Sequence, residues 1–225
     1  MSLEYVIVSI GALSYNPLWG ESSPIRTPHS TTTFIQAGGR LILVDPSLPA
    51  AALGARFNER TGKHHEDVTD VFLTTLHPVH RRGLEAFEKA RVWAHQYELE
   101  AYSGHLHALK DSSTRLGSED VKAIDADLRL LDRIKPAPEK FDDQVSLYPL
   151  AGPSAGSAGL LLTPPTQTIV VAGDAAMTAG HVERGMVWER CADTEVAMES
   201  LREIIELADI VIPGHDNIML IRRQW

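Results

Sequence analysis

The sequence predicts an α/β (α+β) fold in which two β-sheets pack together and helices cover them from outside. In both halves of the chain, pairs of short β-rich segments are followed by helical segments, without the strict strand–helix alternation of a single parallel sheet. Of the 225 residues, 44% are hydrophobic and 23% are charged, which excludes disordered, collagen-like and coiled-coil classes. No break in composition marks a linker, so we expect one domain over residues 1–225.

The first half of the chain is predicted to supply one sheet with its helices. Gly38 and Gly39 separate two β-rich runs and favour a tight hairpin, because glycine accepts positive φ. A helix is expected over residues 50–61, ending at Gly62, and a second over residues 81–90. The predicted strands of this half are 5–10, 31–36, 41–44, 71–74 and 92–94.

The second half repeats the pattern. A helix capped by Ser118 carries one apolar stripe and stops before Pro136, and a last helix is capped by Asp193 or Thr194. Between the two halves, residues 105–107 fit either a helix or a loop. The predicted strands are 145–150, 160–162, 169–172 and 210–212.

Charge and cysteine content narrow the functional classes. Twenty-one Lys and Arg against 30 Asp and Glu give a net charge of −9, which disfavours nucleic acid and anionic membranes as partners. The single cysteine, Cys191, excludes a disulfide within the chain and is expected to be a small buried residue. No Lys or Arg precedes Arg26, and prolines and glycines interrupt the uncharged stretch 144–173. We therefore expect a cytoplasmic protein that acts on a small molecule, with homodimer formation left open.

Potential metal ligands follow three of the predicted strands. His77 and His80 come after one strand, Asp174 follows a second, and His215 follows the last. Ligands gather where strands open into loops, and imidazoles with a carboxylate bind Zn²⁺ or Fe²⁺. His80 is expected near the start of the 81–90 helix, whose positive end favours the neutral ring that binds metal. Each residue alone also fits a turn or a cap.

Four segments resemble the metallo-β-lactamase superfamily, and the resemblance covers nearly the whole chain. Residues 41–45 are similar to its strand-and-aspartate element, and residues 75–80 to its His-x-His-x-Asp-His motif. Gly173-Asp174 and Pro213-Gly214-His215 are similar to its later elements. The resemblance implies a four-layer αββα sandwich of two mixed sheets with helices on both outer faces.

The chain departs from that family at three expected ligands. Thr75 and Pro153 stand where the family has histidines, and Val79 stands where it has an aspartate. Of the three histidines of the family's first metal position, only the one that matches His77 remains. His80, Asp174 and His215 keep the second position, so the resemblance implies one Zn or Fe ion with a degenerate site.

Three functions follow from this set of residues. The first is a mononuclear metal-dependent hydrolase of an ester, thioester, lactone or phosphodiester, with His77 as a further ligand or as the catalytic acid/base. The second is an inactive descendant that binds a ligand and holds no metal. The third is a ribonuclease, because residues 169–215 resemble a metallo-β-lactamase-domain protein whose relatives act on RNA.

Two further histidines are candidates for the site. His29 and His181 are the two remaining histidines that the sequence allows near it. The substrate is not defined by any motif, and the loops 14–30 and 177–190 are expected to choose it. Trp19, Met186 and Trp188 in those loops are candidates for an apolar pocket, for the core or for a dimer contact.

Overall fold

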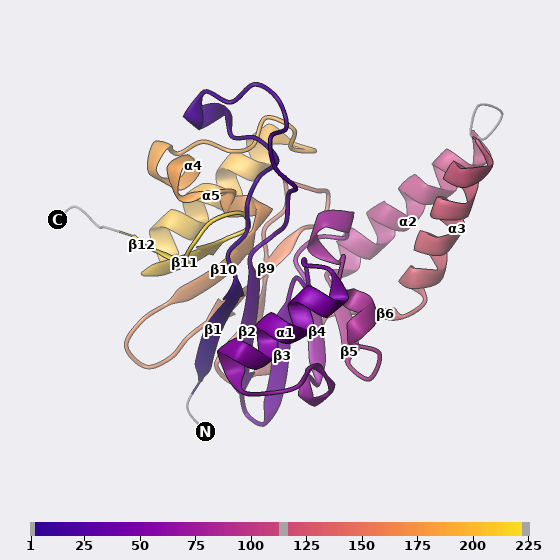
Figure 1. The fold of residues 1–225 in the computed structure, drawn as a ribbon. Helices are drawn as coiled ribbons and strands as arrows, with labels where there is room; N and C mark the ends of the chain where they lie inside the picture. Colours follow the sequence, from indigo (N-terminus) through magenta and orange to yellow (C-terminus); the bar gives the residue numbers. More distant parts are fainter. Residues whose placement is uncertain (1–2, 113–116, 222–225) are drawn as a thin grey trace.

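The computed structural model describes residues 3–112 and 117–221, and within them two six-stranded β-sheets pack together (Figure 1). In the first sheet, β1, β2 and β3 are antiparallel neighbours, and β3 to β6 run parallel. In the second, β10 and β11 are parallel and the other pairs are antiparallel. The first sheet has the order β1 (Glu4–Ser9), β2 (Thr32–Ala37), β3 (Arg40–Val44), β4 (Asp70–Leu73), β5 (Arg91–Ala94), β6 (Ile134–Pro136). The second has the order β12 (Met219–Leu220), β11 (Ile210–Pro213), β10 (Ile169–Gly173), β9 (Ala158–Leu162), β8 (Val145–Pro149), β7 (Lys140–Asp142).

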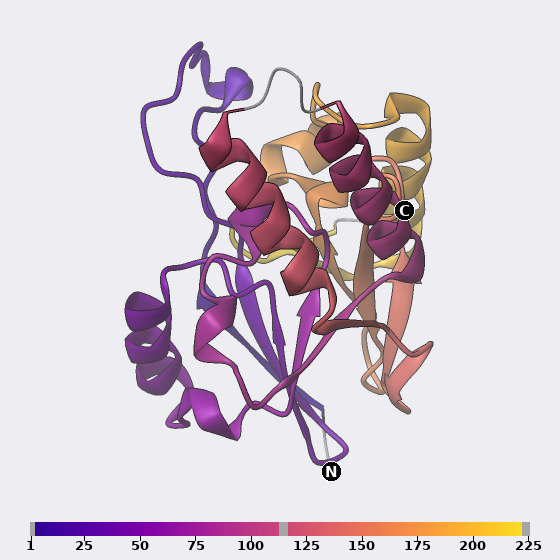
Figure 2. The same ribbon diagram turned by 90° about the vertical axis from the view of Figure 1, so that its right-hand side faces the viewer.

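The hydrophobic core lies in three layers, one between the sheets and one outside each of them. Val44 and Phe72 of the first sheet pack with Leu160 of the second. Successive strand residues point to opposite faces, so each sheet also has an outer apolar face. Phe57 covers the first sheet from outside, and Ile204 covers the second. In Figure 2 the helices α1 and α5 flank the two sheets from opposite sides. The helices are α1 (Ala50–Thr61), α2 (Gln96–Asp111), α3 (Ser118–Leu131), α4 (Ala179–Arg184) and α5 (Thr194–Leu207).

This arrangement confirms the predicted fold class, and several local predictions hold to the residue. Gly38 and Gly39 both have positive φ, at 52° and 82°, in the turn between β2 and β3. Helix α1 covers the predicted residues, and Gly62 ends it in the left-handed conformation with φ 67°. Asp193 caps α5 by accepting hydrogen bonds from two backbone N–H groups.

The predicted helix over residues 81–90 was wrong. Instead, the chain forms two 3₁₀ turns, Pro78–His80 and Leu84–Ala86. The reason is a close tertiary contact at Gly83, whose N–H donates to Pro46 O at 2.7 Å. A Cβ at Gly83 would lie 2.3 Å from Leu48 O, so the loop before α1 packs directly against Gly83. The Gly83 N–H is bonded to that loop and cannot form the hydrogen bond of an α-helix.

The structure settles one alternative that the sequence left open and shifts one helix start. Residues 105–107, left open between helix and loop, lie inside the 16-residue helix α2. Helix α3 begins at Ser118 with Gly117 as its cap, one residue earlier than expected. In the described part of the chain, no helix is both long and apolar enough to span a bilayer.

Candidate metal centre

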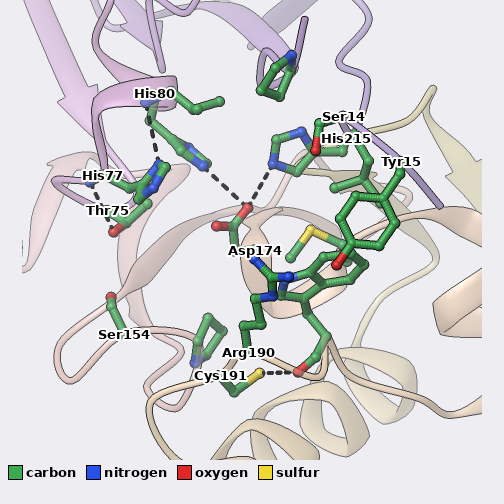
Figure 3. Close-up of a pocket in the computed structure, with 16 residues that line it drawn as sticks. Ser14, Tyr15, Thr75, His77, His80, Ser154, Asp174, Arg190, Cys191 and His215 are labelled. Carbon is green, nitrogen blue, oxygen red and sulfur yellow. Dashed lines mark hydrogen bonds and ion pairs between the residues drawn. The ribbon is translucent and has the colours of Figure 1, made fainter. Parts of the chain in front are cut away.

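Three side chains from separate strand ends meet beside one cavity (Figure 3). His80 closes the 3₁₀ turn after β4, Asp174 follows β10 directly, and His215 lies two residues beyond β11. One ligand atom from each lies within 4.8 Å of the others, and no further His, Cys, Asp or Glu of the described residues joins this group. We call His80, Asp174 and His215 the triad.

The triad is arranged around one carboxylate oxygen. Asp174 Oδ1 lies 3.2 Å from His80 Nε2 and 3.1 Å from His215 Nε2. The two imidazole rings are perpendicular, with centroids 5.6 Å apart. Their Nε2 atoms therefore approach the same oxygen from two directions, as Figure 3 shows.

Two glycines allow this approach. Gly173 turns the chain at the end of β10 with a φ of 53°, which a residue with a side chain rarely adopts. A Cβ at Gly214 would lie 2.9 Å from Asp174 Oδ1 and 2.7 Å from the carbonyl carbon of Gly173. Backbone conformation and close packing therefore explain why glycine precedes both Asp174 and His215.

A second carboxylate fixes the ring of His80 from behind. Asp45 is buried at the end of β3, and its Oδ2 lies 2.9 Å from His80 Nδ1. Thr74 donates to both oxygens of Asp45, from its backbone N–H at 2.9 Å and its hydroxyl at 2.7 Å. Asp45 has a positive φ of 50°, in the region that aspartate tolerates better than most residues. Because Nδ1–H donates to Asp45, Nε2 is the atom that the ring presents to Asp174.

The ring of His215 is fixed by the backbone. Its Nδ1 lies 3.0 Å from His29 O and 3.3 Å from Ala12 O, and both are acceptors. Nδ1 must therefore carry the proton, and the lone pair of the neutral ring is on Nε2.

The centre of the triad fits a cation. His80 Nε2 and Asp174 Oδ1 are buried, and among the described residues their close polar contacts are the ion pairs within the triad, with no hydrogen bond to a group outside it. Buried polar atoms in native structures usually have well-formed hydrogen bonds or metal contacts, and a cation between these atoms would supply such contacts. Two imidazole nitrogens and one carboxylate oxygen are ligands that suit Zn²⁺ or Fe²⁺.

The electrostatics of the metal-free triad favour opposite charges. Burial alone would lower the pKa of His80, but the carboxylates of Asp174 and Asp45 outweigh it and hold that pKa well above its ordinary value. Burial alone would raise the pKa of Asp174, but His80 and His215 hold it well below its ordinary value. The expectation that a helix dipole keeps His80 neutral was wrong, because no helix starts there and two carboxylates face the ring.

His77 is not brought into the triad. It lies at the exposed start of the same 3₁₀ turn, where its Nδ1 accepts a hydrogen bond from Val79 N–H at 3.3 Å. Its ring lines the cavity, with its centroid 6.4 Å from that of His80. Burial, together with the charge of nearby His80, lowers the pKa of His77.

A buried glutamate, Glu98, binds one missing-ligand position, Thr75, and Ser154, the residue after a second such position, Pro153. Thr75 Oγ1 donates to Glu98 Oε1 at 2.7 Å, and Ser154 Oγ donates to Glu98 Oε2 at 2.7 Å. The backbone N–H groups of Leu76 and Gly156 also donate to this carboxylate. The sequence did not single out Glu98, because no element was predicted just after the strand at residues 92–94 and its partners are 22 to 58 residues away in the chain.

The other candidate residues have different partners. His29 Nε2 lies 2.9 Å from Ile10 O, and His181 Nδ1 lies 2.7 Å from the Thr178 hydroxyl, so neither ring joins the triad. Cys191 is half-buried at the cavity wall, and its thiol donates to Trp188 O.

The cavity in front of the triad has a volume of about 320 Å³. Trp188, for which pocket, core and dimer contact were left open, lines it. Trp19 and Met186 lie outside the cavity lining and are 66% and 45% exposed. Its other apolar walls are Leu13, Tyr15, Pro28, Val79, Pro153 and Met177.

Comparisons with known proteins agree on the fold. The model of the metallo-beta-lactamase superfamily matches residues 26–215. A metallo-beta-lactamase candidate from Thermotoga maritima is 17% identical, with a TM-score of 0.69 over 98% of this chain and 100% of that one. The dizinc quorum-quenching lactonase AidC, solved with the product N-hexanoyl-L-homoserine, is 14% identical, with a TM-score of 0.69 over 100% and 92% of the two chains. AiiA of B. thuringiensis, solved as a mutant with N-decanoyl-L-homoserine at its active site, is 18% identical, with a TM-score of 0.64 over 96% and 93%. A search of curated proteins finds no match to this chain.

Proposed function

Since this chain belongs to the metallo-beta-lactamase superfamily, we propose that it is a hydrolase that uses one divalent ion, Zn²⁺ or Fe²⁺, held by His80, Asp174 and His215. The observation that carries this proposal is that His80 Nε2 and Asp174 Oδ1, both buried at the centre of the triad, have no hydrogen-bond partner outside the triad among the described residues. The substrate is a small ester, thioester, lactone or phosphodiester, in keeping with a cavity of about 320 Å³.

When bound, such an ion supplies Lewis acidity that polarises the scissile carbonyl or phosphoryl group and activates water. The chain's own residues set the geometry. Asp45 and the carbonyl of His29 hold the two rings with Nε2 toward the cavity. His77 accepts from Val79 N–H through Nδ1, so its neutral ring carries the proton on Nε2. We assign this N–H to hydrogen-bond a substrate oxygen at the cavity wall.

A single ion is proposed because the other position lacks ligands. Thr75 and Ser154 direct their hydroxyls to Glu98, and Val79 and Pro153 offer no donor atom from their side chains. The same observation favours the second candidate function, a binding protein of this fold without catalytic activity. The two functions differ in what happens when the metal is removed.

The test is to measure metal content and ester hydrolysis in the untagged wild type beside His80→Ala and His215→Ala. We expect about one Zn or Fe per chain in the wild type, little in either variant, and hydrolysis that a chelator abolishes and added metal restores. His105→Ala is the matched control, because His105 is exposed on α2 outside the triad. Equal metal content in all four proteins would contradict the ligand assignment. No metal in the wild type, together with no hydrolysis of any ester, thioester, lactone or phosphodiester tested, would favour the binding protein.

A further inference from the structure

Apart from histidines, the described lining of the cavity contains one basic side chain, that of Arg190. Arg190 lines it from the segment after α4, and Figure 3 shows its side chain reaching toward the same space as Asp174. Its guanidinium carbon lies 5.8 Å from the centroid of the Tyr15 ring, which also lines the cavity. The aromatic ring therefore orients the guanidinium at the wall.

The positive charge of Arg190 is only weakly compensated by nearby acidic groups. Among the described residues, the one acidic group in ion-pair range is Glu189, whose Oε1 lies 3.9 Å from Arg190 Nε. Their side chains are 71% and 61% exposed, and pairs of this kind contribute little. Glu189 also accepts the Tyr15 hydroxyl at 3.1 Å, so its carboxylate is shared.

The lining of the cavity carries one fixed charge of each sign. Asp174 is the one carboxylate among the described lining residues, because Val79 stands where the family's motif has an acid. Among the lining residues the charges of Asp174 and Arg190 cancel, and the carboxylates of Asp45 and Glu189 lie directly behind the lining residues His80 and Tyr15. Arg190 is therefore the lining side chain that an anionic group of a ligand would contact.

Resting on the hydrolase function above, we propose that the substrate is an ester, thioester or lactone with a free carboxylate, and that Arg190 binds this carboxylate. The reacting group lies at the triad, and the carbon chain between the two ends packs along Tyr15, Trp188 and Met177. A single guanidinium suits one carboxylate, which it holds through two parallel hydrogen bonds. Arg190 is accordingly a specificity-determining residue and takes no part in proton transfer.

The kinetic test compares two p-nitrophenyl esters of the same five-carbon acyl length, the pentanoate and the hydrogen glutarate. We expect Arg190→Gln to raise the KM for the glutarate ester about tenfold or more, with kcat nearly unchanged and the pentanoate unaffected. Arg190→Lys keeps the charge but loses the two-pronged geometry, so we expect a smaller rise. Arg184→Gln is the control, because Arg184 is exposed on α4 outside the cavity lining.

A binding test separates this proposal from the hydrolase function. Isothermal titration of the metal-loaded protein with glutarate should give at least tenfold weaker binding in Arg190→Gln than in the wild type and Arg184→Gln. If glutarate binding depends on Arg190 but neither ester is hydrolysed, the hydrolase function fails and the anion site stands. No glutarate binding by the wild type, or equal changes for both esters in Arg190→Gln, would overturn the proposal.

Discussion

At the scale of single residues, the groups behind the triad matter as much as the triad. His80 is oriented by Asp45, and Asp45 is fixed in turn by two hydrogen bonds from Thr74. A carboxylate behind a ligating imidazole sets its tautomer and increases its basicity. The unusual backbone conformation of Asp45 is consistent with a residue held in place for this contact.

Asp45→Asn is predicted to weaken metal binding about 10- to 100-fold, because the ring of His80 loses its charged acceptor. Zinc affinity measured by competition with a chromophoric chelator tests this directly. Asp143→Asn is the control, since Asp143 is exposed and distant from the triad in the β7–β8 turn. Equal affinity in both variants would show that Asp45 has no such role.

Metal binding is also predicted to release protons at neutral pH. The pKa of His80 in the metal-free chain lies well above 6.5, so its ring is protonated there and must lose a proton when Nε2 binds metal. Affinity should therefore fall as the pH falls, and should still be rising with pH above 6.5. Zinc titration calorimetry in buffers of different ionisation enthalpy measures the protons released. Release of no proton at pH 7 would contradict the predicted charge of His80.

The sequence predicts the three triad residues as metal ligands, but it does not show which residues orient them. His80, Asp174 and His215 follow strands, and strand ends are visible in a pattern of apolar residues. Asp45 stood out only as part of a family element, since its contact with His80 spans 35 residues and depends on the turn after β4. Whether His77 lies inside or beside the ligand group depends on the direction of one 3₁₀ turn, which no spacing reveals.

At the scale of elements, the first turn of α2 ties together two loops that line the cavity. Glu98 is 4% exposed and accepts four hydrogen bonds, two from the loop after β4 and two from the loop before β9. A buried carboxylate with that many donors is a structural anchor, and it accepts the hydroxyl of Thr75, one of the positions where the family has a ligand.

Glu98→Ala is predicted to lower the free energy of unfolding by about 3 kcal/mol, because the N–H groups of Leu76 and Gly156 stay buried without an acceptor. Urea denaturation of the metal-free protein measures the loss. Glu100→Ala, an exposed position on the same helix, is the matched control and should change stability by less than about 0.5 kcal/mol. A similar small change for Glu98→Ala would contradict the anchoring role.

Element prediction succeeded where local signals decide the structure. The Gly38-Gly39 turn and helix α1 follow from glycine placement and apolar spacing. The predicted 81–90 helix failed because the Gly83 N–H and the space around it belong to the loop at residues 46–48. Such an override by tertiary contact cannot be seen in a local pattern.

At the scale of the whole molecule, the two sheets bring the ends of β4, β10 and β11 to one place. The ligands are about 95 and 40 residues apart in sequence, and the packing of sheet against sheet converts this separation into one site. The fold class followed from the sequence because strand pairs and outer helices alternate in both halves. The chain's net charge of −9 makes a nucleic-acid substrate the weakest of the three functions considered.

A bound ion is predicted to stabilise the folded chain as a whole. At a free zinc concentration about 100 times the dissociation constant, binding contributes about 2.7 kcal/mol, which raises the Tm by roughly 5–10 °C for a chain of this length. Differential scanning calorimetry with zinc and with chelator measures the shift. An identical Tm in both conditions would favour the binding protein that holds no metal.

The central claim is that one ion lies between His80, Asp174 and His215. Anomalous diffraction at the zinc absorption edge from crystals grown with zinc tests it most directly. We predict one anomalous peak in this region, about 2.0–2.2 Å from Nε2 of both histidines and from an oxygen of Asp174. No peak there, or a second peak beside Thr75 and Ser154, would contradict the account.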